Sequence, residues 1–150
     1  MKKVVERRTR NKYHMLVHKL SKLIGKQQKD FGIPEKDQRN DGWKAAIAKL
    51  KTLKQLHLPL DMIQCFMLTA AAIHNNKKSE QPIDADHFIN IAIYVYVKSS
   101  TVKTPAITEA ELLFIEGLMD KQTAMSEGGY YFTVFRSVVN WIYAFEEKKE

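Results

Sequence analysis

Apolar residues recur at the spacing of an α-helix along most of this chain, and this periodicity restricts the fold more than any other feature. The first stripe consists of Tyr13, Leu16, Val17, Leu20, Leu23 and Ile24. Such a spacing places the side chains on one face of a helix. Five later segments show the same pattern. The sequence therefore predicts an all-α fold, a compact bundle of about six helices.

Glycine, proline and capping residues mark where these helices begin and end. The turn at residues 31–34 ends the first helix, and Asn40 or Asp41 can cap the second. Thr108 and Glu111 have the spacing of a capping box, in which each side chain accepts a hydrogen bond from the other residue's backbone. The predicted helices are residues 4–29, a second ending near 56, a third at 61–73, a fourth at 84–98, and two C-terminal helices within 108–147.

The fourth segment also fits a strand. Its residues 88–97 include alternating β-branched side chains, which are common in strands. No second strand candidate exists to pair with it, and a lone strand would leave backbone groups without partners. We therefore interpret the segment as a helix, with Asp84 or Asp86 as its N-cap. The third segment is apolar almost all round, so we expect it at the centre of the bundle.

Length and composition fit a single domain over residues 1–150. Apolar residues make up 45% of the chain and charged residues 27%, close to the globular average. No run approaches the roughly 18 apolar residues of a membrane span, and the basic start lacks the apolar stretch of a secretory signal. The one cysteine, Cys65, excludes an intramolecular disulfide. The sequence predicts a cytoplasmic protein that does not enter a membrane.

Positive charge is concentrated in the first third of the chain. Residues 1–54 hold 16 of the 24 Lys and Arg residues. A basic field of this kind attracts phosphate backbones or an acidic protein, although a solvated helix face explains it equally well. The candidate residues for binding a partner or a nucleic acid are Lys2, Lys3, Arg7, Arg8, Arg10, Lys12, Lys19, Lys22 and Lys26.

Residues that could carry catalysis lack the spacing that catalysis needs. His57, His74 and His87 have no second ligand at the positions of a zinc motif. Cys65 lies in an apolar run, which raises a thiol pKa and favours packing over nucleophilic attack. No glycine-rich phosphate loop or serine nucleophile motif occurs. The sequence thus favours a protein without catalytic activity or cofactors.

Five short motifs within residues 13–97 occur in an order that resembles small, phage-encoded, all-α MazG-like proteins. They are Leu20…Leu23-Ile24, Phe31-Gly32-Ile33-Pro34, Ala46-Ile47-Ala48, Leu60-Asp61-Met62-Ile63 and the segment DHFINIAIY at 86–94. Those proteins carry an aromatic-Gly-x-Pro turn, an Ile-Ala helix and a final helix reading Asp-x-x-x-Asp-Ile-Ala-Gly-Tyr. In the wider superfamily the resemblance implies a magnesium-dependent nucleoside triphosphate pyrophosphatase.

The chain departs from that pattern at its acidic residues. Residues 42–56 contain no acid, and Asn90 stands where the family has its second aspartate. Magnesium prefers several hard oxygen ligands, and only Asp61, Asp84 and Asp86 are available to supply them. The last two are equally explained as helix caps. If the fold is shared, we expect the catalysis to have been lost.

The favoured interpretation is a non-catalytic interaction protein, encoded by a phage or mobile element, that binds a host protein or a nucleic acid through residues 1–54. The first alternative is a divergent MazG-like pyrophosphatase that uses magnesium, and the second is a helical DNA-binding protein. The C-terminal helices are rich in aromatic residues, which are enriched at interfaces, so a homodimer through them is a further prediction.

Overall fold

The computed structural model describes the backbone of residues 2–78 and 80–147 and the side chains of residues 7–78 and 80–147, and every regular element in this part of the chain is a helix. The α-helices are α1 (Lys2–Leu23), α2 (Lys44–Lys51), α3 (Pro59–Asn75), α4 (Ala85–Ser99), α5 (Glu109–Leu118), α6 (Lys121–Ala124) and α7 (Glu127–Ala144). Three 3-10 helices join them: η1 (Gln28–Phe31), η2 (Glu35–Asp37) and η3 (Thr52–Gln55). The predicted all-α class is confirmed. None of the described helices is long and apolar enough to cross a membrane.

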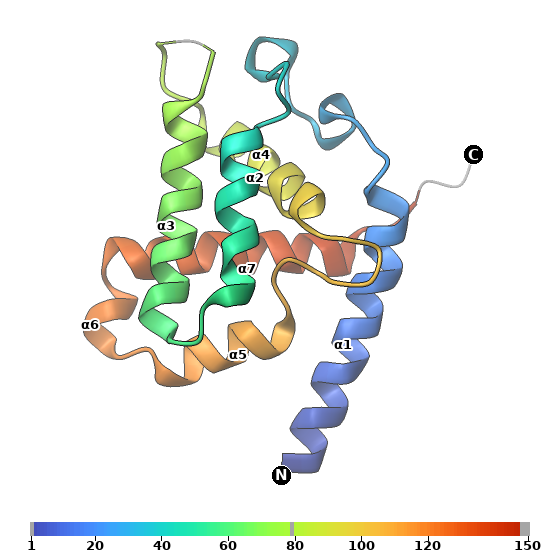
Figure 1. Ribbon diagram of the computed structural model, residues 1–150, viewed down its shortest axis with the longest axis vertical. Coiled ribbons are helices and arrows are strands. Elements are labelled where there is room, and N and C mark those ends of the chain that lie inside the picture. The colour runs from blue at the N-terminus through green and yellow to red at the C-terminus, as the bar shows by residue number, and fades with distance from the viewer. Residues whose placement is uncertain (1, 79, 148–150) are drawn as a thin grey trace.

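The helices pack in crossing layers. α2 and α3 run side by side, and α7 crosses behind them (Figure 1). At the crossing of α3 and α7 the rings of Phe66 and Phe135 stack with their centroids 5.0 Å apart. The N-terminal half of α1 extends past the rest of the bundle (Figure 1). The core therefore lies where α2, α3, α4 and α7 meet.

α4 is the most enclosed helix, whereas the sequence analysis predicted that the helix at 61–73, now α3, lies at the centre. Every residue from 91 to 97 is buried, so the segment is apolar on all sides. That burial explains why its sequence also fitted a strand: a helix surrounded by neighbours does not need a polar face. The interpretation of residues 88–97 as a helix is confirmed.

The first two helices begin and end differently from the prediction. α1 stops at Leu23 instead of residue 29, and the chain turns at Gly25 before η1. The N-cap of α2 is Trp43 in the left-handed conformation, with φ 62°, and not Asn40 or Asp41. The Asp41 Oδ1 atom accepts a hydrogen bond of 3.0 Å from the Trp43 backbone. Burial of the Trp43 ring, which is 1% exposed, holds this rare conformation.

The C-terminal third contains one helix more than predicted. The capping box is confirmed, because Glu111 N donates to Thr108 Oγ1 and Thr108 N donates to a Glu111 carboxylate oxygen. A single turn, α6, then separates α5 from α7, with Asp120 accepting from the Thr123 backbone at 2.7 Å. Four residues are too few to show a helical period, so pattern reasoning missed this turn.

Candidate functional site

The basic residues of the first helix fall into two groups. Arg7, Arg8 and Arg10 lie on the part of α1 that extends past the bundle (Figure 1), and all three are exposed. The side chains of Lys2 and Lys3 lie outside the described residues. This end of the basic face is free to meet a partner.

The remaining lysines of α1 lie against the C-terminal end of α7, where Lys12 and Lys19 are half-buried. Lys12 Nζ is 4.2 Å from the centroid of the Tyr143 ring, and Lys19 donates to the Phe145 carbonyl. Lys22 pairs with Glu147 at 3.5 Å. These cations stabilise helix packing, because they meet an aromatic face and the carbonyls of a helix end. Lys26 lies beyond α1, beside a pocket described below.

The three candidate magnesium ligands do not meet. Asp61 lies in the first turn of α3, whereas Asp84 and Asp86 lie at the start of α4, beyond the other end of α3. A helix of that length separates its ends by roughly 25 Å. Among the described residues no group of three His, Cys, Asp or Glu side chains could hold a metal ion.

The histidines and the cysteine have structural surroundings. His74 stacks on Phe88 at 4.8 Å, and burial together with Lys77 lowers its pKa. His87 Nδ1 is buried 3.4 Å from a carboxylate oxygen of Asp37 in η2, and it forms no hydrogen bond with any described residue. Cys65 donates to the Lys49 carbonyl, and burial raises its thiol pKa. Cys65 is thus not an activated nucleophile, and His57 is exposed at the turn before α3.

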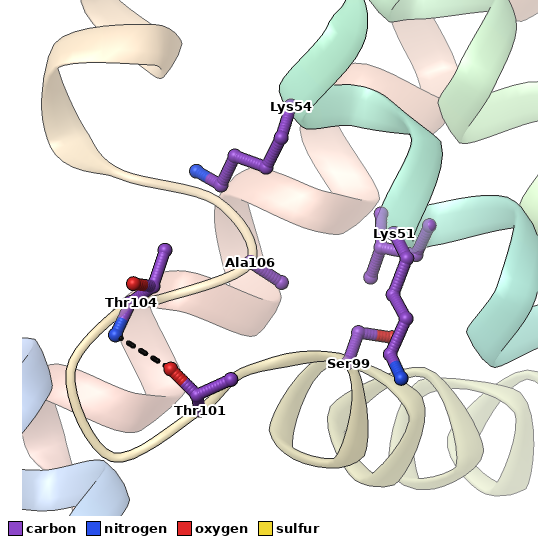
Figure 2. Close-up of a pocket in the computed structure, with 7 residues that line it drawn as sticks. Lys51, Lys54, Ser99, Thr101, Thr104 and Ala106 are labelled. Atoms are coloured by element: carbon purple, nitrogen blue, oxygen red, sulfur yellow. Dashed lines mark hydrogen bonds between the residues drawn. The ribbon is translucent and has the colours of Figure 1, made fainter.

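A hollow of about 280 Å³ lies between α2 and the loop after α4 (Figure 2). Three of its polar side chains already have partners. Lys54 pairs with Glu111 at 2.7 Å, Ser99 donates to the Val95 carbonyl, and Thr101 Oγ1 accepts from the Thr104 backbone. Lys51 is the one lining lysine for which no ion pair is found within the described residues. The hollow contains no arrangement of nucleophile and base.

Aromatic rings connect the N-terminal ends of α4 and α7. Phe88 of α4 lies between His74 and Tyr131, with centroids 4.8 Å and 6.5 Å away. Tyr131 in turn contacts Tyr130 at 5.1 Å. Tyr130 is 59% exposed, so the row of rings leads from the core to the surface. We call the residues at these helix ends the α4–α7 surface: Asp86, Tyr130 and Thr133 are exposed, Tyr131 is half-exposed, and Phe88 is buried beneath them.

Two glycines bring Tyr130 to this surface. A Cβ atom on Gly128 would lie 2.7 Å from Ile63 Cγ2, and one on Gly129 would lie 2.2 Å from the Ala124 carbonyl oxygen. Both distances are too short for a side chain, so α7 approaches α3 and α6 this closely only with glycine at these positions. Ser126 accepts from Gly129 N and caps the helix. The cap and the two glycines in the first turn of α7 thus place Tyr130.

Asp86 is the free carboxylate of the α4–α7 surface. It lies in the first turn of α4, where a negative charge is favoured by the helix dipole. Its side chain is exposed and forms no hydrogen bond or ion pair with any described residue. Asp84, by contrast, lies 3.7 Å from His87. An exposed carboxylate without an internal partner can bind a cationic group of another protein.

A second carboxylate and tyrosine lie near the opposite end of α7, inside the protein. Arg136 donates two hydrogen bonds to Glu109, of 2.7 and 2.8 Å, and Tyr143 donates a third of 2.8 Å. These donors hold the pKa of Glu109 below its ordinary value, against the opposing effect of burial. Glu109 is 7% exposed. This cluster joins α5 to α7, and its charges are paired with each other.

Comparison with known proteins gives one consistent family. The sequence model of the vacuolar sorting protein 9 (VPS9) domain matches residues 43–147. "GTPase-activating protein and VPS9 domain-containing protein 1" of Xenopus laevis and of Homo sapiens are each 22% identical over 139 residues, covering 91% of this chain and 9% of the relative. "Vacuolar protein sorting-associated protein 9A" of Oryza sativa subsp. japonica is 26% identical over 112 residues, covering 71% and 22%. The chain spans less than a quarter of each relative's length.

These matches overturn the resemblance to MazG-like proteins. The resemblance rested on short motifs within residues 13–97 and left the C-terminal helices unexplained, whereas the new match covers α2 to α7 continuously. The phage or mobile-element origin, the pyrophosphatase alternative and the DNA-binding alternative are wrong for the same reason. The segment at 86–94 that carried the resemblance is the buried helix α4, whose apolar composition is shared by many enclosed helices.

Proposed function

Since the chain belongs to the VPS9 domain family, we propose that it is a guanine nucleotide exchange factor for a Rab GTPase of the Rab5 class. The observation that carries the proposal is the continuous match over residues 43–147, which includes the whole α4–α7 surface. Of the two partner classes expected from the sequence, a protein and a nucleic acid, the family supports the protein. The family match begins after α1, so the basic helix lies outside it.

Nucleotide exchange makes a definite demand on such a surface. A GTPase holds GDP through a phosphate-binding loop, its lysine and a magnesium ion. An exchange factor accelerates release only if it binds the nucleotide-free GTPase more tightly than the nucleotide-bound form. It therefore needs groups that replace some of the contacts the phosphates made, together with apolar area that holds the GTPase in place.

The α4–α7 surface has both kinds of group. Asp86 presents a carboxylate without an internal partner, and a carboxylate can pair with the lysine or the metal that the phosphates leave. Tyr130 offers an exposed ring that packs against Tyr131, which in turn packs against Phe88. In this proposal Asp86 acts on the phosphate site of the GTPase, and Tyr130 provides the apolar contact beside it.

The experiment measures release of a fluorescent GDP analogue from purified Rab5-class GTPases. We expect the wild-type chain to accelerate release and Asp86→Asn to reduce that acceleration at least tenfold, the effect of about 1.4 kcal/mol. Asp61→Asn is the matched control. Asp61 is also an exposed carboxylate, but it lies in the first turn of α3, whereas Asp86 lies beyond the other end of that helix. Absence of acceleration with every Rab GTPase tested would refute the proposed function. An equal loss in the Asp86 and Asp61 variants would refute the role of the α4–α7 surface.

A further inference from the structure

A second pocket, of about 320 Å³, lies where the segment after α1 packs on the C-terminal half of α4. Its size is at the lower end of the range for pockets that hold small ligands. Three lysines line it: Lys26 from the turn after α1, Lys29 from η1, and Lys98 from α4. The proposed exchange surface does not include any of them. Lys26 was among the candidate binding residues of the sequence, but Lys98 was not.

The walls of this pocket are fixed by hydrogen bonds. The Gln28 side chain donates to the Arg39 carbonyl and accepts from Arg39 N and from Trp43 Nε1. The Gln38 side chain donates to the Ile33 carbonyl. These bonds join η1 to the loop before α2, so the pocket is formed before any ligand arrives. A preformed site loses less conformational entropy on binding.

The acidic residues near the pocket already have partners. Asp30 accepts from Gln27 N, and Asp41 accepts from Trp43 N and lies 3.5 Å from Arg39. Lys26 and Lys29, in contrast, form no ion pair with any described residue. Positive charge therefore remains uncompensated inside a concave surface, where it attracts anions more strongly than on an open one.

Of the three lysines, Lys98 gives the strongest indication of an anion site. Its amino group is half-buried, donates to the Ile24 carbonyl and lies 5.6 Å from the centroid of the Tyr94 ring. An ammonium group has three donors, so one carbonyl leaves it undersatisfied. Burial lowers the pKa of Lys98, because its ammonium group has lost contacts with water. An anion in the pocket would replace those contacts. The Tyr94 hydroxyl has no partner within the described residues and can donate as well.

We propose that this pocket binds a small phosphorylated ligand through Lys26, Lys29 and Lys98. Phosphate oxygens accept charge-assisted hydrogen bonds from lysine, and three ammonium groups around one cavity match one or two phosphate groups. Phosphate on a lipid headgroup and phosphate on a soluble molecule share this chemistry. The proposal does not depend on exchange activity, because none of its residues belongs to the α4–α7 surface.

The first arm of the test uses inorganic pyrophosphate, titrated into the full chain at low salt and followed by calorimetry. Lys98→Gln and the double variant Lys26→Gln/Lys29→Gln should each weaken binding about tenfold, the loss expected for a charge-assisted contact. Lys98→Arg should keep the binding. Lys51→Gln is the matched control, because Lys51 lines the other hollow and its substitution removes the same charge. An equal loss with Lys51→Gln would show general charge attraction and overturn the proposal.

The second arm separates the two sources of phosphate. Phosphatidylcholine vesicles containing phosphatidylinositol monophosphate are compared with vesicles containing phosphatidylserine at matched charge. Selective binding to the former that is lost in Lys98→Gln assigns a lipid headgroup, and pyrophosphate binding without vesicle selectivity assigns a soluble phosphate. Absence of both kinds of binding in the wild-type chain overturns the proposal. The double variant changes side chains outside the core, so we expect it to fold. Its circular dichroism spectrum checks this.

Discussion

A tyrosine of α7 and a carboxylate of another helix occur toward each end of α7, and the two pairs differ in their exposure to water. Near the C-terminal end, Glu109 accepts hydrogen bonds from both Tyr143 and Arg136. Near the N-terminal end, Asp86 and Tyr130 are exposed, and Asp86 has no partner among the described residues. A carboxylate and a tyrosine therefore hold the fold together in one place and remain available to a partner in the other.

Burial and available donors decide between these outcomes. Glu109 is removed from water, so it needs Arg136 and Tyr143 to compensate its charge. Asp86 keeps its water and needs no internal donor. Substitutions at the buried cluster should therefore change stability, and substitutions at the α4–α7 surface should change exchange with little effect on stability.

Removing Arg136 should have the largest effect. Arg136→Leu leaves Glu109 buried without its main donor, and breaking a buried pair in this way costs about 3 kcal/mol of unfolding free energy. Urea unfolding measures the loss. The double variant Glu109→Gln/Arg136→Leu should recover part of it, because the uncompensated charge is gone. A loss for Arg136→Leu well below about 1 kcal/mol would show that the cluster is not a stabilising element.

Acid should weaken the protein through Glu109. Its pKa is below its ordinary value of 4.5 because Arg136 donates to the charged form. The resulting stability is complete above pH 4.5 and is lost as the pH falls below that value through the pKa of the folded state. In Glu109→Gln this part of the acid dependence should disappear, although the variant is less stable at neutral pH. Thermal unfolding at a series of pH values measures both effects, and an unchanged acid dependence would contradict this account.

Sequence reasoning found the helices but not the surfaces that they form. The apolar stripes and the Thr108–Glu111 box depend on residues close in sequence, so the class and most boundaries followed. The left-handed Trp43 and the early end of α1 depend on packing between distant segments, which periodicity does not contain. The same holds for the proximity of Phe88 and Tyr131. Short apolar motifs also misled the family assignment, since the enclosed α4 has few features of its own.

Removing the helix cap should have a smaller effect than removing Arg136. Thr108→Ala deletes the side chain that accepts from Glu111 N, and loss of such a cap costs about 1 kcal/mol. The cap lies one residue before Glu109, so the loss should appear as faster amide exchange in the first turn of α5. Asp120→Ala, which removes the cap of the single-turn α6, is the comparison. An equal effect on the whole chain from both variants would mean that the cap does not act locally.

The smallest change in stability is expected at Tyr130. Its ring is 59% exposed, so Tyr130→Ala should alter the unfolding free energy by no more than about 0.5 kcal/mol. The proposed exchange activity should nevertheless fall at least tenfold, because the variant removes the ring that faces the partner while Gly128 and Gly129 still place the helix.

Tyr143→Phe is the control at the other end of α7: it deletes the hydroxyl that donates to Glu109, and it should lower stability while exchange per folded molecule stays unchanged. If Tyr130→Ala lowers stability as much as Tyr143→Phe does, the two ends of α7 do not differ in the way that burial predicts. If exchange falls equally in both variants, the activity depends on the integrity of α7 as a whole and not on its N-terminal end.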